Sequence, residues 1–373
     1  MRRLAALATI LMLAGLSLPI PGGGSNLEFW ILVPPYAFAG ALSAAIVVAL
    51  AAGPLGQRPW AGVLFLVGLV LGASAPLFLV CAKPGLGLAC PGLWIYLSGL
   101  ALVAWGALEF LAGLNVARWG LGLAAPVLFG VWIVYLWEAG VVGFGVPQVL
   151  LPAPHQIGFQ LVNQATVLWG DFRQTFLRAV LAGWAAGCGL GFFVAVAVDR
   201  IPFLQRGLLP LSNLASAVPI VGIAPIMVMW FGFDWQSKAA VVVVMTFFPM
   251  LINVIAGLAG SDAMSRDLMR SYGAGYWQTF FKLRLPAALP FVFNALKINS
   301  TLALIGAIVA EFFGSPISGM GFRISVEVAR MNVDVVWATI AVAALAGSLF
   351  YSLIAMVERG LTFWHPSYRK ASR

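Results

Sequence analysis

Charged residues are scarce in this chain. Only 9% of its 373 residues are Asp, Glu, Lys or Arg, whereas 62% are hydrophobic and the mean hydropathy is +1.00. A soluble protein carries about 25% charged residues, so this chain has too few to cover the surface of a soluble domain. Intrinsic disorder requires low hydrophobicity and is excluded as well. Because the apolar runs are continuous rather than alternating, the composition predicts an all-α integral membrane protein and not a transmembrane barrel.

Residues that form metal and catalytic sites are also rare. The chain has two histidines, His155 and His365, and three cysteines, with no C-x-x-C motif and no His/Cys cluster. We therefore expect no metal site. No paired carboxylates and no Ser/His/Asp set fall on one membrane face, which argues against an integral-membrane enzyme. A G-x-x-x-x-G-K-S/T phosphate loop is missing too, so we expect no cofactor in this chain and no ATP bound in that way.

Apolar stretches long enough to span a membrane are abundant, since a span needs about 20 residues. Ten are predicted: residues 4–20, 29–51, 60–82, 92–113, 119–142, 175–198, 208–231, 237–258, 288–313 and 335–357. The first follows Arg2-Arg3 as a signal peptide would, but residues 18–24 contain no A-x-A cleavage pattern. We favour an uncleaved helix over a cleaved leader.

The basic residues lie in ones and twos between these stretches, which is typical of charges that set membrane orientation rather than of a nucleic-acid site. Most of the 21 Lys and Arg residues fall on the side that holds both termini and the loop at residues 259–287. The positive-inside rule places that side in the cytoplasm. Cys81 and Cys90 then flank one short outward loop, where they form either a disulfide or two free thiols.

The two portions of the chain differ in character. Residues 1–118 form a predicted module of about four spans, with no chemistry that the residues reveal. Carboxylates inside a membrane are often functional, but Glu109 and Glu138 lie close to span ends, which favours a structural role. Residues 119–373 contain about six spans and one long cytoplasmic loop, at residues 259–287.

That loop has the pattern of two short amphipathic helices. In the first, Ser261 is a candidate N-cap and Gly273 a candidate left-handed C-cap. Side chains four residues apart form one apolar stripe and one charged stripe: Met264, Leu268 and Tyr272, and Asp262, Arg266 and Arg270, the last three spaced to pair along the helix.

The second predicted helix covers residues 275–284 and has two aromatic pairs at i, i+4, Tyr276/Phe280 and Trp277/Phe281. Pro286 either ends this helix or opens the next span. Three interpretations of the whole loop remain open: an interfacial helix pair, packing under its own bundle, or docking to a cytoplasmic partner.

The run from Asp267 to Gly273, followed by nine residues and then Leu283-Arg284-Leu285-Pro286, resembles the EAA loop of ABC importer permeases. Gly273, Leu285 and Pro286 match that signature, whereas Asp267 replaces its Glu. Leu268-Met269 replace its two Ala and Leu283 replaces its Ile. Residues 150–154, 223–232 and 304–314 resemble the nitrate/taurine/sulfonate-type permeases and their thiamine-precursor and riboflavin relatives. The likeness runs from residue 132 to the C-terminus.

This resemblance implies a type I importer permease in a bacterial inner membrane, surrounded by lipid and working as a dimer with a second permease copy. It implies two cytoplasmic ATPase subunits, which bind ATP and Mg, and an extracytoplasmic solute-binding protein. The residues that would contact the ATPase are Arg266, Asp267, Leu268, Arg270, Tyr272, Gly273, Ala274, Leu285 and Pro286. The suggested solute is a thiamine precursor or riboflavin, with sulfonate, taurine or nitrate as the alternative.

Polar residues inside the later spans are candidates for the translocation pathway: Asn213, Ser216, Asn294, Lys297, Asn299 and Glu311. Each has a structural alternative, and for Lys297 we favour one in which the side chain reaches the interface. An ion-coupled secondary carrier is the competing class, but it needs carboxylates central to the bundle, and Glu109, Glu138 and Glu311 are peripheral in the span map.

Overall fold

The computed structural model describes residues 91–113, 124–201, 219–314 and 317–363, with isolated residues between 7 and 14, at 73, and between 203 and 207. Helices, with short π-helical turns, are the regular structure of these residues, and no strand occurs among them. The chain divides into two compact units, Met1–Gly158 and Phe159–Arg373. The predicted module boundary at residue 118 lies outside the described residues.

The described part of the first unit contains two long apolar helices, α5 (Pro91–Gly113) and α6 (Ala124–Gly143). Trp94 of α5 stacks on Phe144, just after α6, with 4.3 Å between ring centroids. The helix α7 (Pro154–Asn163) begins in this unit. Glu138 of α6 stabilises the first turn of α7. Its carboxylate accepts a hydrogen bond from the amide of His155 at 3.0 Å and lies 2.6 Å from Nδ1 of the His155 ring. This contact gives Glu138 a structural partner.

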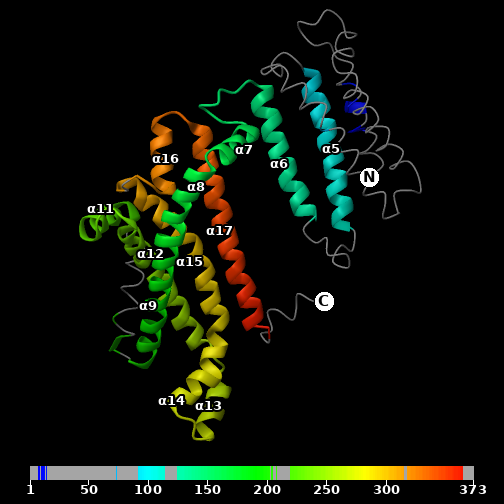
Figure 1. The fold of residues 1–373 in the computed structure, drawn as a ribbon. Helices are drawn as coiled ribbons and strands as arrows, with labels where there is room; N and C mark the ends of the chain where they lie inside the picture. Colours follow the sequence, from blue (N-terminus) through cyan, green and yellow to red (C-terminus); the bar gives the residue numbers. More distant parts are fainter. Residues whose placement is uncertain are drawn as a thin grey trace, which may run out of the picture. The chain divides into compact units, whose positions relative to one another are not determined.

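The second unit is a helical bundle that carries the candidate site (Figure 1). Its helices are α8 (Ala165–Phe172), α9 (Leu181–Arg200), α11 (Ile220–Phe231), α12 (Trp235–Ala259), α13 (Ala263–Ser271), α14 (Tyr276–Thr279), α15 (Leu285–Phe313), α16 (Met320–Ala329) and α17 (Val333–Leu361). Two π-helical turns, η4 (Arg173–Val180) and η5 (Phe280–Arg284), join α8 to α9 and α14 to α15.

Five helical runs among the described residues are long and apolar enough to cross a membrane: Pro126–Gly143, Ala165–Arg200, Trp235–Ala259, Tyr276–Phe313 and Val333–Leu361. They confirm the predicted spans at these positions, and shorter apolar helices lie at Gly92–Trp105 and Val221–Phe231. Apart from isolated positions, the spans predicted at residues 4–20, 29–51 and 60–82 and the first part of 208–231 lie outside the described residues. One predicted start was wrong: the helix predicted from residue 175 begins at Ala165, because α8 continues through η4 into α9.

Two of these runs, Ala165–Arg200 with 36 residues and Tyr276–Phe313 with 38, are far longer than a membrane requires. At 1.5 Å per residue, the 38-residue run Tyr276–Phe313 is about 57 Å long, against a hydrocarbon core of about 30 Å. Part of it must therefore project from the membrane. Figure 1 shows α13 and α14 at this projecting end, beyond the end of α17, while α16 lies at the opposite end of the unit.

The close packing of α9 on α12 depends on three glycines spaced four residues apart, Gly183, Gly187 and Gly191. A Cβ at Gly183 would lie 2.7 Å from the carbonyl of Ala239, and one at Gly191 would lie 2.7 Å from the carbonyl of Phe247. Small residues at this spacing let two helix backbones approach closely, which gains dispersion energy in a lipid environment.

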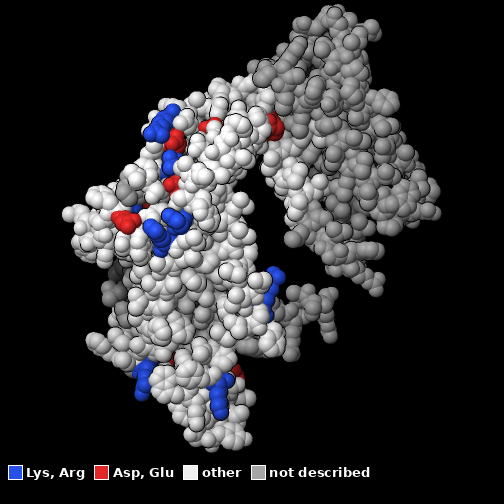
Figure 2. Space-filling view, viewed as in Figure 1, with Lys and Arg blue, Asp and Glu red and all other residues white. Residues whose placement is uncertain are grey.

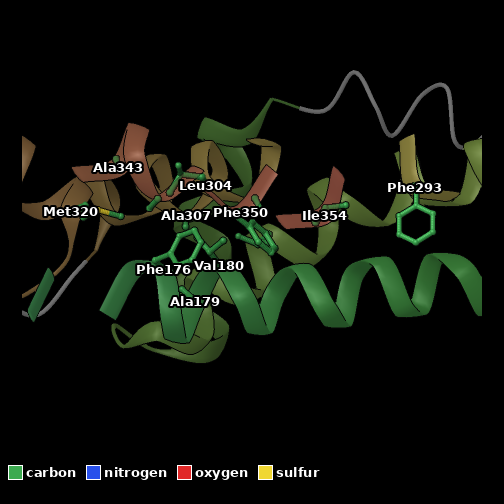
Figure 3. Packing of buried hydrophobic residues seen from close by; sticks show 13 residues of the cluster. Phe176, Ala179, Val180, Phe293, Leu304, Ala307, Met320, Ala343, Phe350 and Ile354 are labelled. Carbon is green, nitrogen blue, oxygen red and sulfur yellow. The ribbon is translucent and has the colours of Figure 1, made fainter. Parts of the chain in front are cut away.

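A core of apolar side chains joins η4, α15 and α17 (Figure 3). Phe350 of α17 is its centre, because the ring packs edge-on against Phe176 at 5.6 Å and against Trp184 at 5.0 Å. Ala303 and Ala307 of α15 are completely buried in the same cluster. The bundle around α12 and α15 therefore has packed side chains on several faces.

Adding one methyl group at Gly187 should destabilise this bundle. A Cβ there would collide with Thr246 Oγ1 and lie 2.9 Å from the backbone carbonyl of Val243, which cannot move aside alone. Gly187→Ala should cost about 1–3 kcal/mol and lower the melting temperature of the detergent-purified protein by about 5 °C. The matched control is Gly189→Ala, where nothing lies within 4 Å of the added Cβ. Equal melting temperatures for the two variants would contradict the packing described for α9 and α12.

Candidate functional site

The first candidate element is α13, a helix capped by Asp262. The Asp262 carboxylate accepts hydrogen bonds from the hydroxyl of Ser265 at 2.9 Å and from its amide at 3.0 Å. These bonds hold the pKa of Asp262 below its ordinary value, so the cap is present at neutral pH and is lost as the pH falls through that lowered pKa. The predicted cap at Ser261 was wrong, since Ser261 is buried and its hydroxyl donates to the carbonyl of Leu258. Asp262 therefore caps the helix instead of pairing with Arg266.

The apolar stripe of α13 faces outward. Met264, Leu268 and Tyr272 are 79%, 57% and 81% exposed, and α13 buries none of its residues. This excludes the interpretation in which the stripe packs under its own bundle. Large apolar side chains gathered on one exposed helix face indicate a surface that something else covers.

Gly273 ends α13 as the sequence predicts. Its φ is +70°, a left-handed conformation that glycine adopts without steric cost. The amide of Gly273 donates to the carbonyl of Arg270 at 2.9 Å, and the amide of Ala274 donates to that of Met269 at 3.0 Å. These two bonds form a Schellman motif, which reverses the chain sharply before α14.

The second element, α14, continues into the apolar helix α15 without a break. The chain is helical from Tyr276 through η5 and α15 to Phe313, so Pro286 opens the span rather than ending the preceding helix. Proline has no amide hydrogen to continue the α-helical ladder, and the π-helical turn η5 directly precedes it. Both predicted aromatic pairs are confirmed: Tyr276 stacks with Phe280 at 6.2 Å, and Trp277 with Phe281 at 5.9 Å.

An ion pair fixes this second element to a distant part of the chain. The guanidinium of Arg284 donates two hydrogen bonds to the carboxylate of Asp199, at 2.6 and 2.7 Å, and two more to the carbonyl of Leu258, at 3.1 and 3.3 Å. The sequence patterns did not indicate Asp199. Its only signal is an acidic residue at the end of an apolar span, 85 residues before its partner.

An open hollow of about 620 Å³ lies between α13 and the end of α9. Its walls carry both signs of charge and come from α9, α13, α14 and η5: Asp199, Ala263, Arg266, Asp267, Arg270, Ala274, Tyr276, Thr279 and Arg284. The structure thus brings Arg266, Asp267, Arg270 and Ala274 together around one cavity. Leu285 and Pro286 lie farther along the chain, at the start of α15.

The candidate pathway residues that the structure describes, Asn294, Lys297, Asn299 and Glu311, do not form one group. Lys297 of α15 pairs with Glu358 of α17, with Nζ and Oε2 2.6 Å apart. Asn299 is buried and donates to the carbonyl of Thr246 at 2.8 Å and to the sulfur of Cys188. Asn294 is exposed. Asn213 and Ser216 lie outside the described residues, as do Cys81, Cys90 and the side chain of Glu109.

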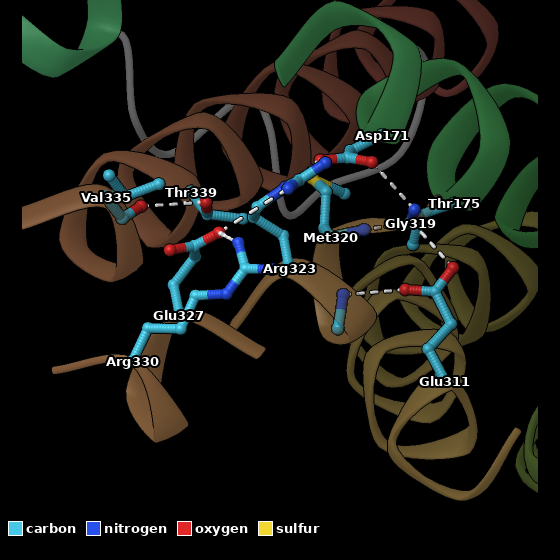
Figure 4. Close-up of polar contacts among 11 residues, drawn as sticks. Asp171, Thr175, Glu311, Gly319, Met320, Arg323, Glu327, Arg330, Val335 and Thr339 are labelled. Carbon is cyan, nitrogen blue, oxygen red and sulfur yellow. Dashed lines mark hydrogen bonds and ion pairs between the residues drawn. The ribbon is translucent and has the colours of Figure 1, made fainter. Parts of the chain in front are cut away.

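Glu311 belongs to a polar web at the end of the unit opposite α13 and α14 (Figure 4). The hydroxyl of Thr175 donates to Glu311 at 2.7 Å and accepts from the amide of Met320 at 2.7 Å. Arg323 of α16 donates to Asp171 of α8 at 2.8 Å and lies near Glu327. The web ties α16 to α8, η4 and α15. Among the described residues, no group of three or more His, Cys, Asp or Glu side chains is arranged to hold a metal ion.

Comparison with known proteins agrees with this geometry. Residues 187–363 match the family model described as binding-protein-dependent transport system inner membrane component. The chain is 30% identical to the formylaminopyrimidine transport permease protein of Halalkalibacterium halodurans over 239 residues, which are 64% of this chain and 95% of that protein.

Two further relatives match over a similar length. The riboflavin transport system permease protein of Chloroflexus aurantiacus is 29% identical over 66% of this chain and 91% of its own length. A putative aliphatic sulfonates transport permease protein of Bacillus subtilis is 31% identical over 66% of this chain and 88% of its own length. These relatives are transport permeases rather than enzymes, and they do not favour the ion-coupled carrier as an alternative class.

Proteins of this kind are multi-pass inner-membrane subunits that work with a separate ATPase and a solute-binding protein. The apolar helical bundle and the exposed two-helix element at its end fit that description. The chain therefore belongs to the family of binding-protein-dependent transport system inner membrane components, the permease subunits of ABC importers.

Proposed function

We propose that α13 and α14 are the coupling element through which a cytoplasmic ATPase dimer drives this permease. The observation that carries the proposal is the exposed stripe of Met264, Leu268 and Tyr272 on a helix that buries no residue of its own. An amphipathic helix of this kind suits a groove on a partner protein. In this proposal Leu268 and Tyr272 enter the groove, and Arg266, Asp267 and Arg270 make polar contacts beside it.

The remaining residues of the element shape it and connect it to the membrane. Gly273 and Ala274 form the tight turn between the helices, and Leu285 and Pro286 join the second helix to α15. ATP and Mg would be bound by the partner, because this chain has no phosphate loop. The helical run Tyr276–Phe313 is continuous, so a displacement of α14 by the partner would move the membrane-spanning part of α15 as well.

The end of the unit that carries α13 and α14 faces the cytoplasm in this proposal, with both termini on the same side. Figure 2 shows Lys and Arg at both ends of the unit, but beside Asp and Glu mainly at the α16 end. There Arg323 and Arg330 contact Glu327, whereas Arg266 and Arg270 line an open hollow. An excess of Lys and Arg is typical of the cytoplasmic end.

A second copy of the permease would complete the translocation pathway, with lipid covering the rest of the bundle. The described helices leave large apolar side chains exposed on several faces, among them Phe193 of α9, Met229 of α11 and Leu349 of α17. In a membrane, such faces contact either lipid or another transmembrane helix. A homodimer is the simplest assembly for a chain that contains one coupling element.

The proposed solute is a small heteroaromatic vitamin or vitamin precursor, such as an aminopyrimidine or riboflavin. This rests on the relatives, two of which are named for formylaminopyrimidine and riboflavin transport. Aliphatic sulfonates and taurine are the second candidates, because other relatives carry those names at similar identity.

An assay with the reconstituted complex distinguishes between these candidate solutes. The permease, its ATPase and its solute-binding protein would be placed in proteoliposomes, and ATP hydrolysis measured with each solute in turn. We expect stimulation by an aminopyrimidine or by riboflavin. Stimulation by taurine or an alkanesulfonate alone would replace the proposed solute but leave the coupling proposal intact.

Placing a charge on the exposed stripe tests the coupling element directly. Leu268→Asp should not disturb folding, because this side chain is 57% exposed, but it should bury a carboxylate in the partner's groove. An unpaired buried charge costs several kcal/mol, so recovery of the ATPase with affinity-tagged permease should fall at least tenfold. The control, Ile317→Asp, adds the same charge at the α16 end, where Ile317 is 79% exposed. ATPase recovery with Leu268→Asp at the level of the control would refute the docking role.

We further propose that Lys297 is structural rather than part of the pathway. Its partner Glu358 lies three residues before the end of α17, and the side chains of the pair are 18% and 7% exposed. Lys297→Met would leave Glu358 buried without its partner and should destabilise the protein by about 3–5 kcal/mol. Replacing both residues with Met should restore thermal stability, measured by melting in detergent, and also ATP-driven uptake. A double variant that is stable but inactive in uptake would instead assign Lys297 to the pathway.

A further inference from the structure

Three helix ends meet where the coupling element joins the bundle. Asp199 is the penultimate residue of α9, Leu258 lies one residue before the end of α12, and Arg284 is the last residue of η5. The Arg284 guanidinium holds the other two at once, through its bonds to the Asp199 carboxylate and the Leu258 carbonyl. With side-chain exposures of 16% and 12%, Arg284 and Asp199 form a largely shielded pair.

The last two residues of α9, Asp199 and Arg200, also contact the first turn of α14. The hydroxyl of Tyr276 donates to Asp199 at 3.1 Å. The guanidinium of Arg200 lies over two rings, 5.2 Å from the centroid of Tyr276 and 5.6 Å from that of Trp277. Such cation–π contacts add to the attachment. The end of α9 is therefore fastened to α14 and η5 at several points, whereas α13 buries nothing against it.

Along the chain, the coupling element is linked directly only to α12, which precedes it, and to α15, which follows it. Through the backbone alone, a movement of the element would therefore reach these two helices first. The residues after α9 reach the element only by way of α11 and α12. From these contacts we propose that the Asp199–Arg284 pair is a positioning contact that makes α9 move with the coupling element. The proposal rests on the coupling role assigned above and adds a third helix to the moving part.

The chemistry of the pair suits this task. Two parallel N–H···O bonds between a guanidinium and a carboxylate fix the relative orientation of both groups, which a single point charge does not do. Along the rest of their length α9 and α12 are held together by the glycine contacts at Gly183, Gly187 and Gly191. A displacement delivered at Asp199 would therefore be passed along a tightly packed helix pair rather than be absorbed by side chains.

The test follows the movement of α9 in the complex of full-length permease with its ATPase. The three native cysteines are replaced by serine, and a spin label is attached at Phe193→Cys, a position on α9 that is 71% exposed. The spectrum of the label is recorded without nucleotide and after trapping with Mg-ATP and vanadate. We expect a nucleotide-dependent change in the parent and a clearly smaller one in Asp199→Asn, where only the glycine contacts with α12 still carry α9 along, with ATPase recovery unchanged.

Rescue variants distinguish a positioning role of the Asp199–Arg284 pair from a role in stability alone. The exchanged pair Asp199→Arg/Arg284→Asp should restore the nucleotide-dependent change, and Arg284→Lys should restore only part of it. The matched control is Arg359→Gln, which removes an exposed charge near the end of α17 and should behave as the parent.

Each other outcome has a defined meaning. A label that does not respond in the parent, or that responds fully in Asp199→Asn, would overturn the inference. Loss of ATPase recovery in Asp199→Asn would also overturn it, because the pair would then serve only to shape the docking surface. Failure of the parent itself to retain the ATPase would refute the proposed function instead.

Discussion

The architecture of the second unit depends on one constraint: a charge removed from water must be given a partner. Several carboxylates of the bundle are buried and have partners within the protein, and the buried Lys238 donates to the carbonyl of Phe233. Asp171 pairs with Arg323 and Glu358 with Lys297, while Glu311 accepts from Thr175 and from the amide of Gly321. Leaving any of these groups unpaired would cost several kcal/mol in a low-dielectric interior. Because the partners come from different helices, each pair also fixes one helix against another.

The two ends of the unit differ in how many of these contacts they contain. At the α16 end, the web around Asp171 and Glu311 closes a short helix onto the bundle through many bonds. At the other end, α14 and η5 are held by Asp199 and Arg200 at the tip of α9, and α13 extends beyond them without burying a residue. A densely bonded end resists displacement, whereas an end held mainly at the tip of one helix passes a displacement on to that helix. This asymmetry fits the coupling role that we propose for α13 and α14.

The glycines of α9 and the proline of α15 show how sequence chemistry sets this mechanical behaviour. Without side chains, Gly183, Gly187 and Gly191 let α9 and α12 touch backbone to backbone, so that the two helices act together. Pro286 interrupts the hydrogen-bond ladder but not the helix, and η5 absorbs the change of register. The proposed coupling element is therefore joined to α15 as a continuous helix with one irregular turn near its base.

Much of this protein was predictable from local patterns. Continuous apolar runs predicted the spans, the i, i+4 spacing predicted the stripe of α13 and the aromatic pairs of α14, and Gly273 predicted the left-handed turn. Each of these features is determined by residues within a few positions of one another. The cap of α13 was misplaced by one residue, since Ser261 and Asp262 are both good caps and only burial of Ser261 decides between them.

The long-range polar contacts could not be predicted: Asp199–Arg284, Lys297–Glu358 and the web around Glu311. Their partners are 61 to 152 residues apart or reach one another only after the helices pack. The sequence alone thus determined the helices and the family, whereas tertiary structure decided which buried charges pair, because no local spacing records which helix ends will meet.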